Sequence, residues 1–184
     1  MTSSATHQTW IQNKLTGLGY SAAEQAKNVI WWKTTSDAIW ARDFGPVSIV
    51  ETGSTGKEKL SFIDYKYYST RVYDDEVPAL LAKEWGINNY RPDLSFEGGN
   101  FQTTSDGLCS STKGTLYYNP QLSQSAVEDI LTTYQGCKKT IFPQPMTGGV
   151  IAHIDMFSKF GADDHMMVGS YTDTQHKANK AILD

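Results

Sequence analysis

Cysteine is scarce in this chain, which has two, Cys109 and Cys137, among 184 residues. Two cysteines do not make the disulfide framework of a small secreted domain, so a reducing compartment is the default expectation. Long apolar runs are also missing, since no stretch approaches the ~20 residues of a membrane span. The N-terminus MTSSATHQTW has neither a charged start nor an apolar segment, so no signal peptide is visible. A cytoplasmic location is therefore the default, and export stays open if the natural N-terminus is longer.

Basic residues are not in excess either. Lysine and arginine number 16 against 20 aspartates and glutamates, which gives a net charge of −4. Because no basic run or basic helical face is present, neither nucleic acid nor an anionic membrane is an expected partner. Hydrophobic residues make up 39% of the chain and charged residues 20%, as in ordinary ordered proteins. The length fits a single domain over residues 1–184.

What the chain does have is an alternation of strand and helix signals, which predicts an α/β fold. NVIWW (28–32), LSFIDYKYY (60–68) and GTLYY (114–118) are predicted to be strands because they are rich in β-branched and aromatic residues. SAVE (125–128) has the form of a capping box and predicts the start of an amphipathic helix. Gly136 predicts the end of that helix.

Three polar motifs recur along the chain at nearly equal spacing. They are WARDFGP, FEGGNF and HIDMF. Asp43 and Asn100 are 57 positions apart, and Asn100 and Asp155 are 55 apart. Each motif is predicted to open a strand that is followed by a second strand and a helix. Such a series predicts a modular array in which each unit buries one face against the next and contributes one polar strand end to a shared centre.

The last motif, HIDMFSKF, places His153 and Asp155 two positions apart in a predicted strand. Residues i and i+2 of a strand project from one face, so these side chains are expected to lie side by side and near Asp43. Simpler alternatives are an edge pair on a wet sheet face for His153 and Asp155, and a turn aspartate for Asp43. Gly98–Asn100 taken alone indicates a turn or bulge. The spacing H-x-D is no metal-ligand signature, so no metal site is predicted.

Taken together, the motifs resemble those of the guanidino-group modifying enzymes. Within these enzymes, the resemblance is to the Porphyromonas-type peptidylarginine deiminase and agmatine deiminase branch. WARDFGP, FEGGNF and HIDMFSKF agree with it in order and spacing, and YYNPQLSQSAVEDIL resembles its connecting segments. The resemblance runs from about residue 25 to the end of the chain. It implies a pentein-type five-bladed β/α propeller of ββαβ units around a central site, with about three units in this chain.

The resemblance also implies a reaction, the hydrolysis of a guanidinium to a ureido product and ammonia through a cysteine thiouronium intermediate. Asp43 and Asp155 would bind the planar guanidinium, for which carboxylates are natural bidentate partners. His153 would pass a proton to the departing ammonia and take one from the attacking water. Glu97 would accept a hydrogen bond from His153 and set its tautomer. Trp40 would pack against the aliphatic stem of the substrate.

Two further residues are assigned to substrate binding on the same resemblance. These are Asn100, in FEGGNF, and Arg71, in YYSTRVYDD, which would contact a substrate carboxylate. A surface ion pair with Asp74 or Asp75 is the alternative for Arg71. The aromatic-rich DYKYYSTRVY is suited to line a site open to a peptide chain. The expected partner is agmatine or the arginine side chain of a peptide, with a slight preference for the peptide. No cofactor is implied, and homo-oligomerisation is left open.

The nucleophile is where the chain departs from the family pattern. The family's cysteine lies after the H-x-D motif, and neither Cys109 nor Cys137 matches its position, so both are expected to be structural or incidental. The third helix, DTQHKANKAILD (173–184), stops without a capping glycine or a following strand. The chain is therefore expected to be truncated and inactive alone. A non-catalytic guanidinium-binding module and a plain β/α interaction scaffold are the alternatives.

Overall fold

The computed structural model of the chain describes residues 5–148, 151–170, 177 and 179. The chain divides into two compact units, Met1–Asp37 and Ala38–Asp184, and each is described by itself. The single domain predicted over residues 1–184 stays a prediction. No helix among the described residues has the length and apolar character needed to cross a membrane.

The N-terminal unit is a pair of helices, α1 (Ala5–Gly17) and α2 (Ala22–Asn28). Ser21 and Glu24 form the capping box that starts α2, each side chain bonding to the backbone amide of the other residue. The predicted strand NVIWW, residues 28–32, is wrong, because it begins with the last residue of α2 and continues as irregular chain. None of the described strands pairs with this apolar run, and its Ile30 is 80% exposed.

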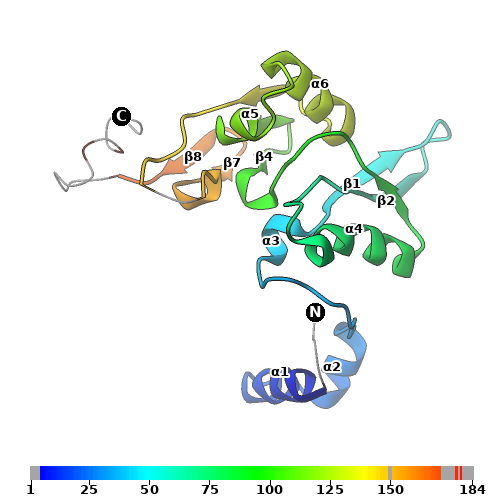
Figure 1. Cartoon of the computed structure of the whole chain (residues 1–184). Coiled ribbons are helices and arrows are strands. Elements are labelled where there is room, and N and C mark those ends of the chain that lie inside the picture. Colours follow the sequence, from blue (N-terminus) through cyan, green and yellow to red (C-terminus); the bar gives the residue numbers. More distant parts are fainter. Residues whose placement is uncertain (1–4, 149–150, 171–176, 178, 180–184) are drawn as a thin grey trace. The chain divides into compact units, whose positions relative to one another are not determined.

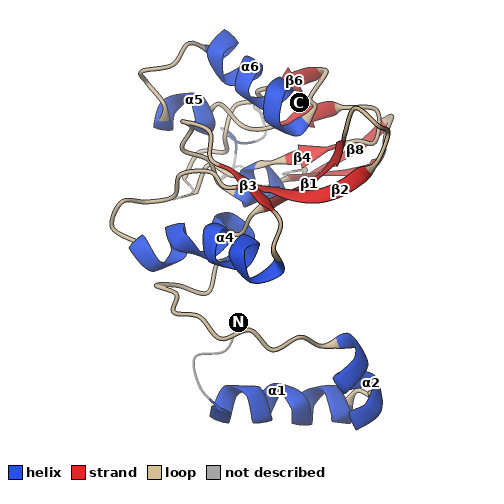
Figure 2. Cartoon of the chain, turned by 90° about the vertical axis from the view of Figure 1, so that its right-hand side faces the viewer, coloured by secondary structure: helices blue, strands red, loops and turns tan. Residues whose placement is uncertain are grey.

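The C-terminal unit repeats one arrangement of elements (Figures 1 and 2). The first group is α3 (Ala41–Phe44), β1 (Val47–Thr52), β2 (Glu58–Ile63), α4 (Val72–Trp85) and β3 (Asn88–Tyr90). The second is η1 (Gly98–Asn100), β4 (Gln102–Thr103), β5 (Leu108–Ser110), α5 (Gly114–Tyr118), α6 (Gln124–Gln135) and β6 (Lys139–Ile141). The third begins with η2 (Ile154–Met156), β7 (Ser158–Ala162) and β8 (His165–Val168).

Sheet topology shows the repeat directly. In the first sheet, β1 and β2 are antiparallel and β3 joins β2 in parallel after α4. In the second, β4 and β5 are antiparallel and β6 joins β5 in parallel after α6. The third sheet has the antiparallel pair β7 and β8. The helix predicted over residues 173–184 lies outside the described residues except at Lys177 and Asn179. Two ββαβ groups and a third hairpin are thus described.

The prediction that the three polar motifs open strands is wrong. Each motif forms a short helical turn just before a strand. Asp43 lies in α3, Asn100 ends η1, and Asp155 lies in η2, a 3₁₀ turn. The strand predicted through His153 and Asp155 is therefore wrong, because the β7–β8 ladder begins at Ser158, opposite Val168. His153 has extended backbone angles and caps η2, so the two side chains do not follow the strand period.

Two other predicted elements are displaced. GTLYY forms the helix α5 rather than a strand, and Leu108–Ser110 is the strand that pairs with both β4 and β6. Helix α6 begins two residues earlier than SAVE predicts, because Ser123 accepts the hydrogen bond from the Ala126 amide. Its end at Gly136 is confirmed. This residue has φ 70°, a left-handed conformation that glycine adopts readily and most other residues do not.

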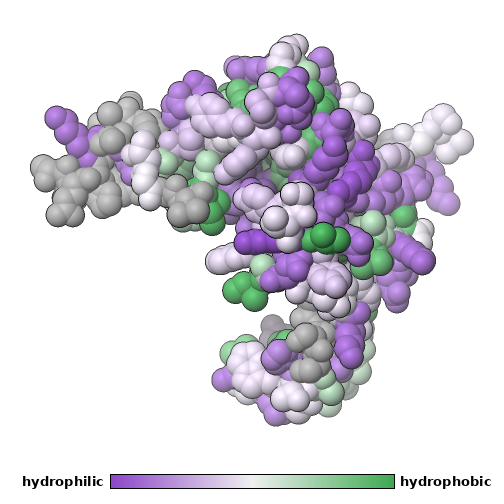
Figure 3. Space-filling view, viewed as in Figure 1, coloured by the Kyte–Doolittle hydropathy of each residue, from purple (hydrophilic) through white to green (hydrophobic). Residues whose placement is uncertain are grey.

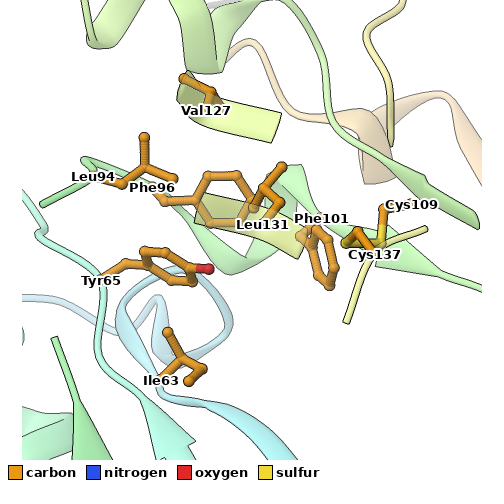
Figure 4. Packing of buried hydrophobic residues seen from close by; sticks show 9 residues of the cluster. All are labelled: Ile63, Tyr65, Leu94, Phe96, Phe101, Cys109, Val127, Leu131 and Cys137. Carbon is orange, nitrogen blue, oxygen red and sulfur yellow. A yellow bond between two sulfur atoms is a disulfide. The ribbon is translucent and has the colours of Figure 1, made fainter. Parts of the chain in front are cut away.

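The hydrophobic core lies mainly in the second group and is shown in Figure 4. Its buried members are Ile63, Tyr65, Leu94, Phe96, Phe101, Cys109, Val127, Leu131 and Cys137. Phe96 and Phe101 pack edge to face with ring centroids 5.7 Å apart. They lie on either side of residues 97–100, so the core fixes both ends of the FEGGNF turn. On the face seen in Figure 3, hydrophilic residues predominate and apolar ones form small separate patches.

Cys109 and Cys137 form a disulfide inside this core (Figure 4). The bond joins β5 to the residue that follows Gly136 at the end of α6, and both cysteines are almost fully buried. Neither cysteine of the chain is therefore a free thiol, and the location of the protein stays a prediction.

Candidate active site

The three turns that precede the sheets meet at one place. Helix α3 contacts η1, and η1 contacts η2. Each turn brings one titratable side chain to this junction. These are Asp43 from α3, Glu97 at the start of η1 and His153 at the start of η2. Segments about 55 residues apart in the sequence therefore form one cluster.

The imidazole of His153 lies between two carboxylates. Its Nδ1 is 3.6 Å from Oδ1 of Asp43, and its Nε2 is 3.2 Å from Oε2 of Glu97. The second contact is within ion-pair distance but is not a well-aligned hydrogen bond, so it is chiefly electrostatic. The side chains of His153, Asp43 and Glu97 are only 5%, 11% and 12% exposed, respectively. Partial exclusion of water strengthens the interactions among them.

Burial and charge act in opposite directions on His153. Burial lowers the pKa of the imidazole, but Glu97, then Asp43 and Asp155, raise it, and the net result is a pKa above the usual 6.5. His153 is therefore protonated to a higher pH than an exposed histidine. Its charged form contributes stability that is fully present below pH 6.5 and is lost as the pH rises through the raised value.

The carboxyl group of Asp43 also has a raised pKa. Burial is the largest cause; His153 lowers the pKa, whereas Glu97 and Asp155 raise it, and the facing backbone amide of Gly99 lowers it. Asp155 itself is exposed and acts on Asp43 only through its charge. The predicted proximity of His153 to Asp43 is confirmed, that of Asp155 to Asp43 stays a prediction, and the predicted strand is wrong. A cation placed between the carboxylates would relieve their repulsion.

Two glycines allow the turns to approach this closely. A Cβ atom on Gly99 would lie 2.5 Å from Oδ1 of Asp43 and 2.5 Å from Nδ1 of His153. A Cβ on Gly98 would overlap the backbone carbonyl oxygen of Arg42 in α3. The GG of FEGGNF is therefore required by close packing between the first and second groups, and not by a left-handed backbone.

Alanine substitutions should separate these two contacts. Gly98→Ala is expected to lower the free energy of unfolding by about 3 kcal/mol, because the clash is with backbone that cannot move alone. Gly99→Ala should cost only about 1 kcal/mol, because two side chains can shift, but the shift opens the gap between Asp43 and His153. Urea unfolding measures both effects. Gly53→Ala, where a Cβ meets only ordinary contacts, is the control, and equal losses at all three positions would contradict this account.

A pocket of about 350 Å³ opens at the cluster. Glu97 and His153 contribute to its lining, and so do three tyrosines, Tyr67, Tyr68 and Tyr118. The hydroxyl of Tyr68 donates a hydrogen bond of 2.8 Å to Oε1 of Glu97, while the other oxygen of Glu97 faces His153. Sequence reasoning missed this role of Tyr68. The aromatic run DYKYYSTRVY was its only signal, and it indicated a binding surface but no particular partner.

Two of the predicted substrate-binding residues lie at the margin. Trp40 precedes α3, is 52% exposed, and does not line the pocket formed by the described residues. Arg71 lies over the rings of Tyr67 and Tyr68 and donates a hydrogen bond of 3.1 Å to the Tyr67 hydroxyl. Asp75, the alternative partner of Arg71, accepts hydrogen bonds from the Tyr67 amide and from Arg91. Arg71 therefore orders the tyrosine wall of the pocket.

The cluster also has the composition of a metal site. Asp43, Glu97 and His153 each offer a ligand atom, and these atoms lie within 4.8 Å of one another. However, Asp43 faces Nδ1 of the imidazole and Glu97 faces Nε2. An ion bound to one ring nitrogen would have one carboxylate facing that nitrogen, while the other carboxylate faces the opposite nitrogen of the ring. Acceptors distributed in this way suit a flat cation with several donors better than a single ion.

Comparison with known proteins agrees with the sequence resemblance. The profile of the Porphyromonas-type peptidyl-arginine deiminase family matches residues 5–184. A Shewanella baltica protein, provisionally named agmatine deiminase, is 28% identical over 163 residues, which cover 81% of this chain and 44% of that protein. A second relative, from Shewanella putrefaciens and named in the same way, is 25% identical over 181 residues and is covered to 49%. The chain spans about half the length of these relatives.

Solved structures share the fold. The agmatine deiminase of Enterococcus faecalis superposes with a TM-score of 0.69 at 23% identity, over 83% of this chain and 45% of that one. The agmatine deiminase of C. jejuni gives a TM-score of 0.71 at 23% identity, over 89% of this chain and 51% of that one. Because the family profile covers nearly the whole sequence, this chain belongs to the Porphyromonas-type peptidyl-arginine deiminase family.

Proposed function

We propose that this chain provides the guanidinium-binding and proton-transfer part of a deiminase that acts on agmatine or on peptidyl-arginine. The observation that carries the proposal is the imidazole of His153, buried between the carboxylates of Asp43 and Glu97 at a tyrosine-lined pocket. The charged form of Asp43, whose pKa is raised by burial, is unfavourable without a cation, and a guanidinium supplies both charge and a fork of donors. Membership of the deiminase family supports the same chemistry.

In the proposed reaction, Asp43 and Asp155 hold the guanidinium nitrogens from two sides and orient the central carbon for attack. A cysteine thiolate adds to that carbon, one C–N bond breaks, and His153 donates the proton that lets ammonia leave. The raised pKa of His153 favours the protonated form that this step requires to a higher pH than in an exposed histidine. His153 then accepts a proton from the water that attacks the thiouronium, and the thiolate is released with the ureido product. Glu97 stabilises the imidazolium throughout.

The thiolate in this scheme comes from outside the 184 residues. The chain has two cysteines, and they are bonded to each other in the core. The ββαβ groups support a larger five-bladed propeller in which this chain supplies about three of the blades. A non-catalytic module that only binds guanidinium compounds is a second candidate, favoured by the absence of a free thiol in the chain.

Ammonia release tests the proposal. The purified 184-residue chain is expected to release no ammonia above background from agmatine, arginine or a peptidyl-arginine, because guanidinium carbon is a poor electrophile without a thiolate. The assay should include Asp43→Asn and His153→Ala variants. Turnover that requires Asp43 and His153 would contradict the proposal that the nucleophile lies outside these 184 residues. A chain that neither turns over nor binds any of the three compounds would contradict the guanidinium site itself.

A further inference from the structure

Asn100 is a buried carboxamide with all of its recorded contacts inside the protein. It is 3% exposed. Its Oδ1 accepts two backbone hydrogen bonds of 3.0 Å, from the amides of Thr112 and Ile154, and its Nδ2 donates one of 3.0 Å to the hydroxyl of Thr115. Two backbone N–H donors on one side fix which end of the amide is oxygen. One side chain thus joins η1 to the segment after β5 and to η2.

The peptide groups held in this way flank His153. The Ile154 amide, on one side, donates to Asn100. The carbonyl of Ala152, on the other side, accepts from the hydroxyl of Thr112, the residue whose own amide is held by Asn100. The backbone before and after His153 is therefore tied to Thr112, two residues after β5, and to the FEGGNF turn. Such ties fix the direction in which the imidazole leaves the chain.

A second buried carboxamide, that of Gln102, holds β7 in place. Gln102 is 5% exposed. Its Nε2 donates to the carbonyl of Ser158 at 2.6 Å, and its Oε1 accepts from the amide of Phe160 at 3.1 Å. Among the described strands, β4 and β7 contact each other but belong to separate sheets, so this side chain replaces strand pairing between them. Its contacts lie beyond η2, away from His153.

We propose that Asn100 is a positioning residue that holds His153 between Asp43 and Glu97 by accepting the backbone hydrogen bond of Ile154. Gln102 holds β7 of the third group in place but does not fix the position of the His153 imidazole. The consequence for guanidinium affinity rests on the proposed function, whereas the effect on His153 itself does not. Asn100 also lines the pocket, so the direct substrate contact predicted for it from the sequence stays a prediction beside this role.

The test compares Asn100→Ala with Gln102→Ala in the 184-residue chain. Hydrogen exchange at the Ile154 amide is expected to accelerate about tenfold or more in Asn100→Ala, because the amide loses its buried acceptor. Titration of the His153 ring by NMR should show its pKa falling toward the ordinary value, because the carboxylate contacts loosen. Gln102→Ala should reduce overall stability and leave both readings at His153 unchanged.

Equal changes at His153 in the two variants would overturn the proposal, because they would indicate general loosening. If Asn100→Ala does not fold, Asn100→Asp decides the matter, since it keeps an acceptor for both amides and should keep Ile154 protected. Loss of that protection in folded Asn100→Asp would also overturn it. Agmatine affinity is measured separately and should weaken about tenfold in Asn100→Ala. Failure of the unmodified chain to bind agmatine would refute the proposed function, while the exchange and NMR results would still decide the role of Asn100.

Discussion

Replacing both cysteines, Cys109→Ser with Cys137→Ser, is expected to lower the free energy of unfolding by about 3–4 kcal/mol. The disulfide closes a loop with a sequence separation of 28 residues, and a cross-link of that length removes about this much conformational freedom from the unfolded chain. The loop contains α5 and α6, so the loss should be felt throughout the second group. That group carries Glu97 and Asn100, and its loosening should therefore reach the site.

Urea unfolding followed by circular dichroism measures this effect. The matched control is the unmodified chain with its disulfide reduced, which should lose nearly as much stability as the double variant. Single variants at either position should behave similarly, because both break the same bond. A double variant within 1 kcal/mol of the oxidised chain would contradict a structural role for this disulfide. It would also reopen the question of whether either cysteine acts as a nucleophile.

Replacing Asp43 by asparagine is expected to weaken agmatine binding by roughly 50-fold or more, about 2–3 kcal/mol, because a partly buried charge facing the guanidinium is lost. The variant should remain folded. A carboxyl group whose folded pKa is raised costs stability once the pH exceeds its unfolded pKa, so removing the charge relieves that cost near neutral pH. Loss of affinity without loss of stability distinguishes binding from folding.

Isothermal calorimetry with agmatine measures the affinity of the Asp43→Asn variant, and thermal unfolding measures its stability. Asp129→Asn is the matched control, since it removes the same charge from an exposed position on α6. It should bind agmatine as the unmodified chain does. Equal losses in the two variants would mean that net charge, and not the position of Asp43, governs binding.

Much of the site could be predicted from the sequence because the spacing of the motifs does not depend on the secondary structure assigned to them. Asp43, Glu97 and His153 belong to repeats of nearly equal length, and equal repeats place equivalent positions together whatever their backbone conformation. The strand assigned to His153 and Asp155 was wrong, yet the proximity of His153 to Asp43 was correct. The end of α6 at Gly136 was predictable for a local reason, the left-handed conformation that glycine adopts there.

Other features depend on contacts that the sequence pattern does not record. GTLYY has strand-like residues, but Leu108–Ser110 occupies the sheet position between β4 and β6 and leaves GTLYY to form a helix. The disulfide joins β5 to the connection between α6 and β6, which the parallel pairing of β5 with β6 brings together. The hydrogen bond from Tyr68 to Glu97 likewise joins two segments 29 residues apart. In each case the tertiary partner decides the outcome.

Asp43, Glu97, His153 and Asp155 are proposed to bind a guanidinium group together. The most direct test is a calorimetric titration of the 184-residue chain with agmatine and with 1,4-diaminobutane, which has the same four-carbon stem and an amine in place of the guanidinium. We predict binding of agmatine at a single site, with at least tenfold weaker binding of the diamine because a point-like ammonium cannot match several carboxylates at once. Equal affinity for the two compounds, or no binding of agmatine, would contradict the account.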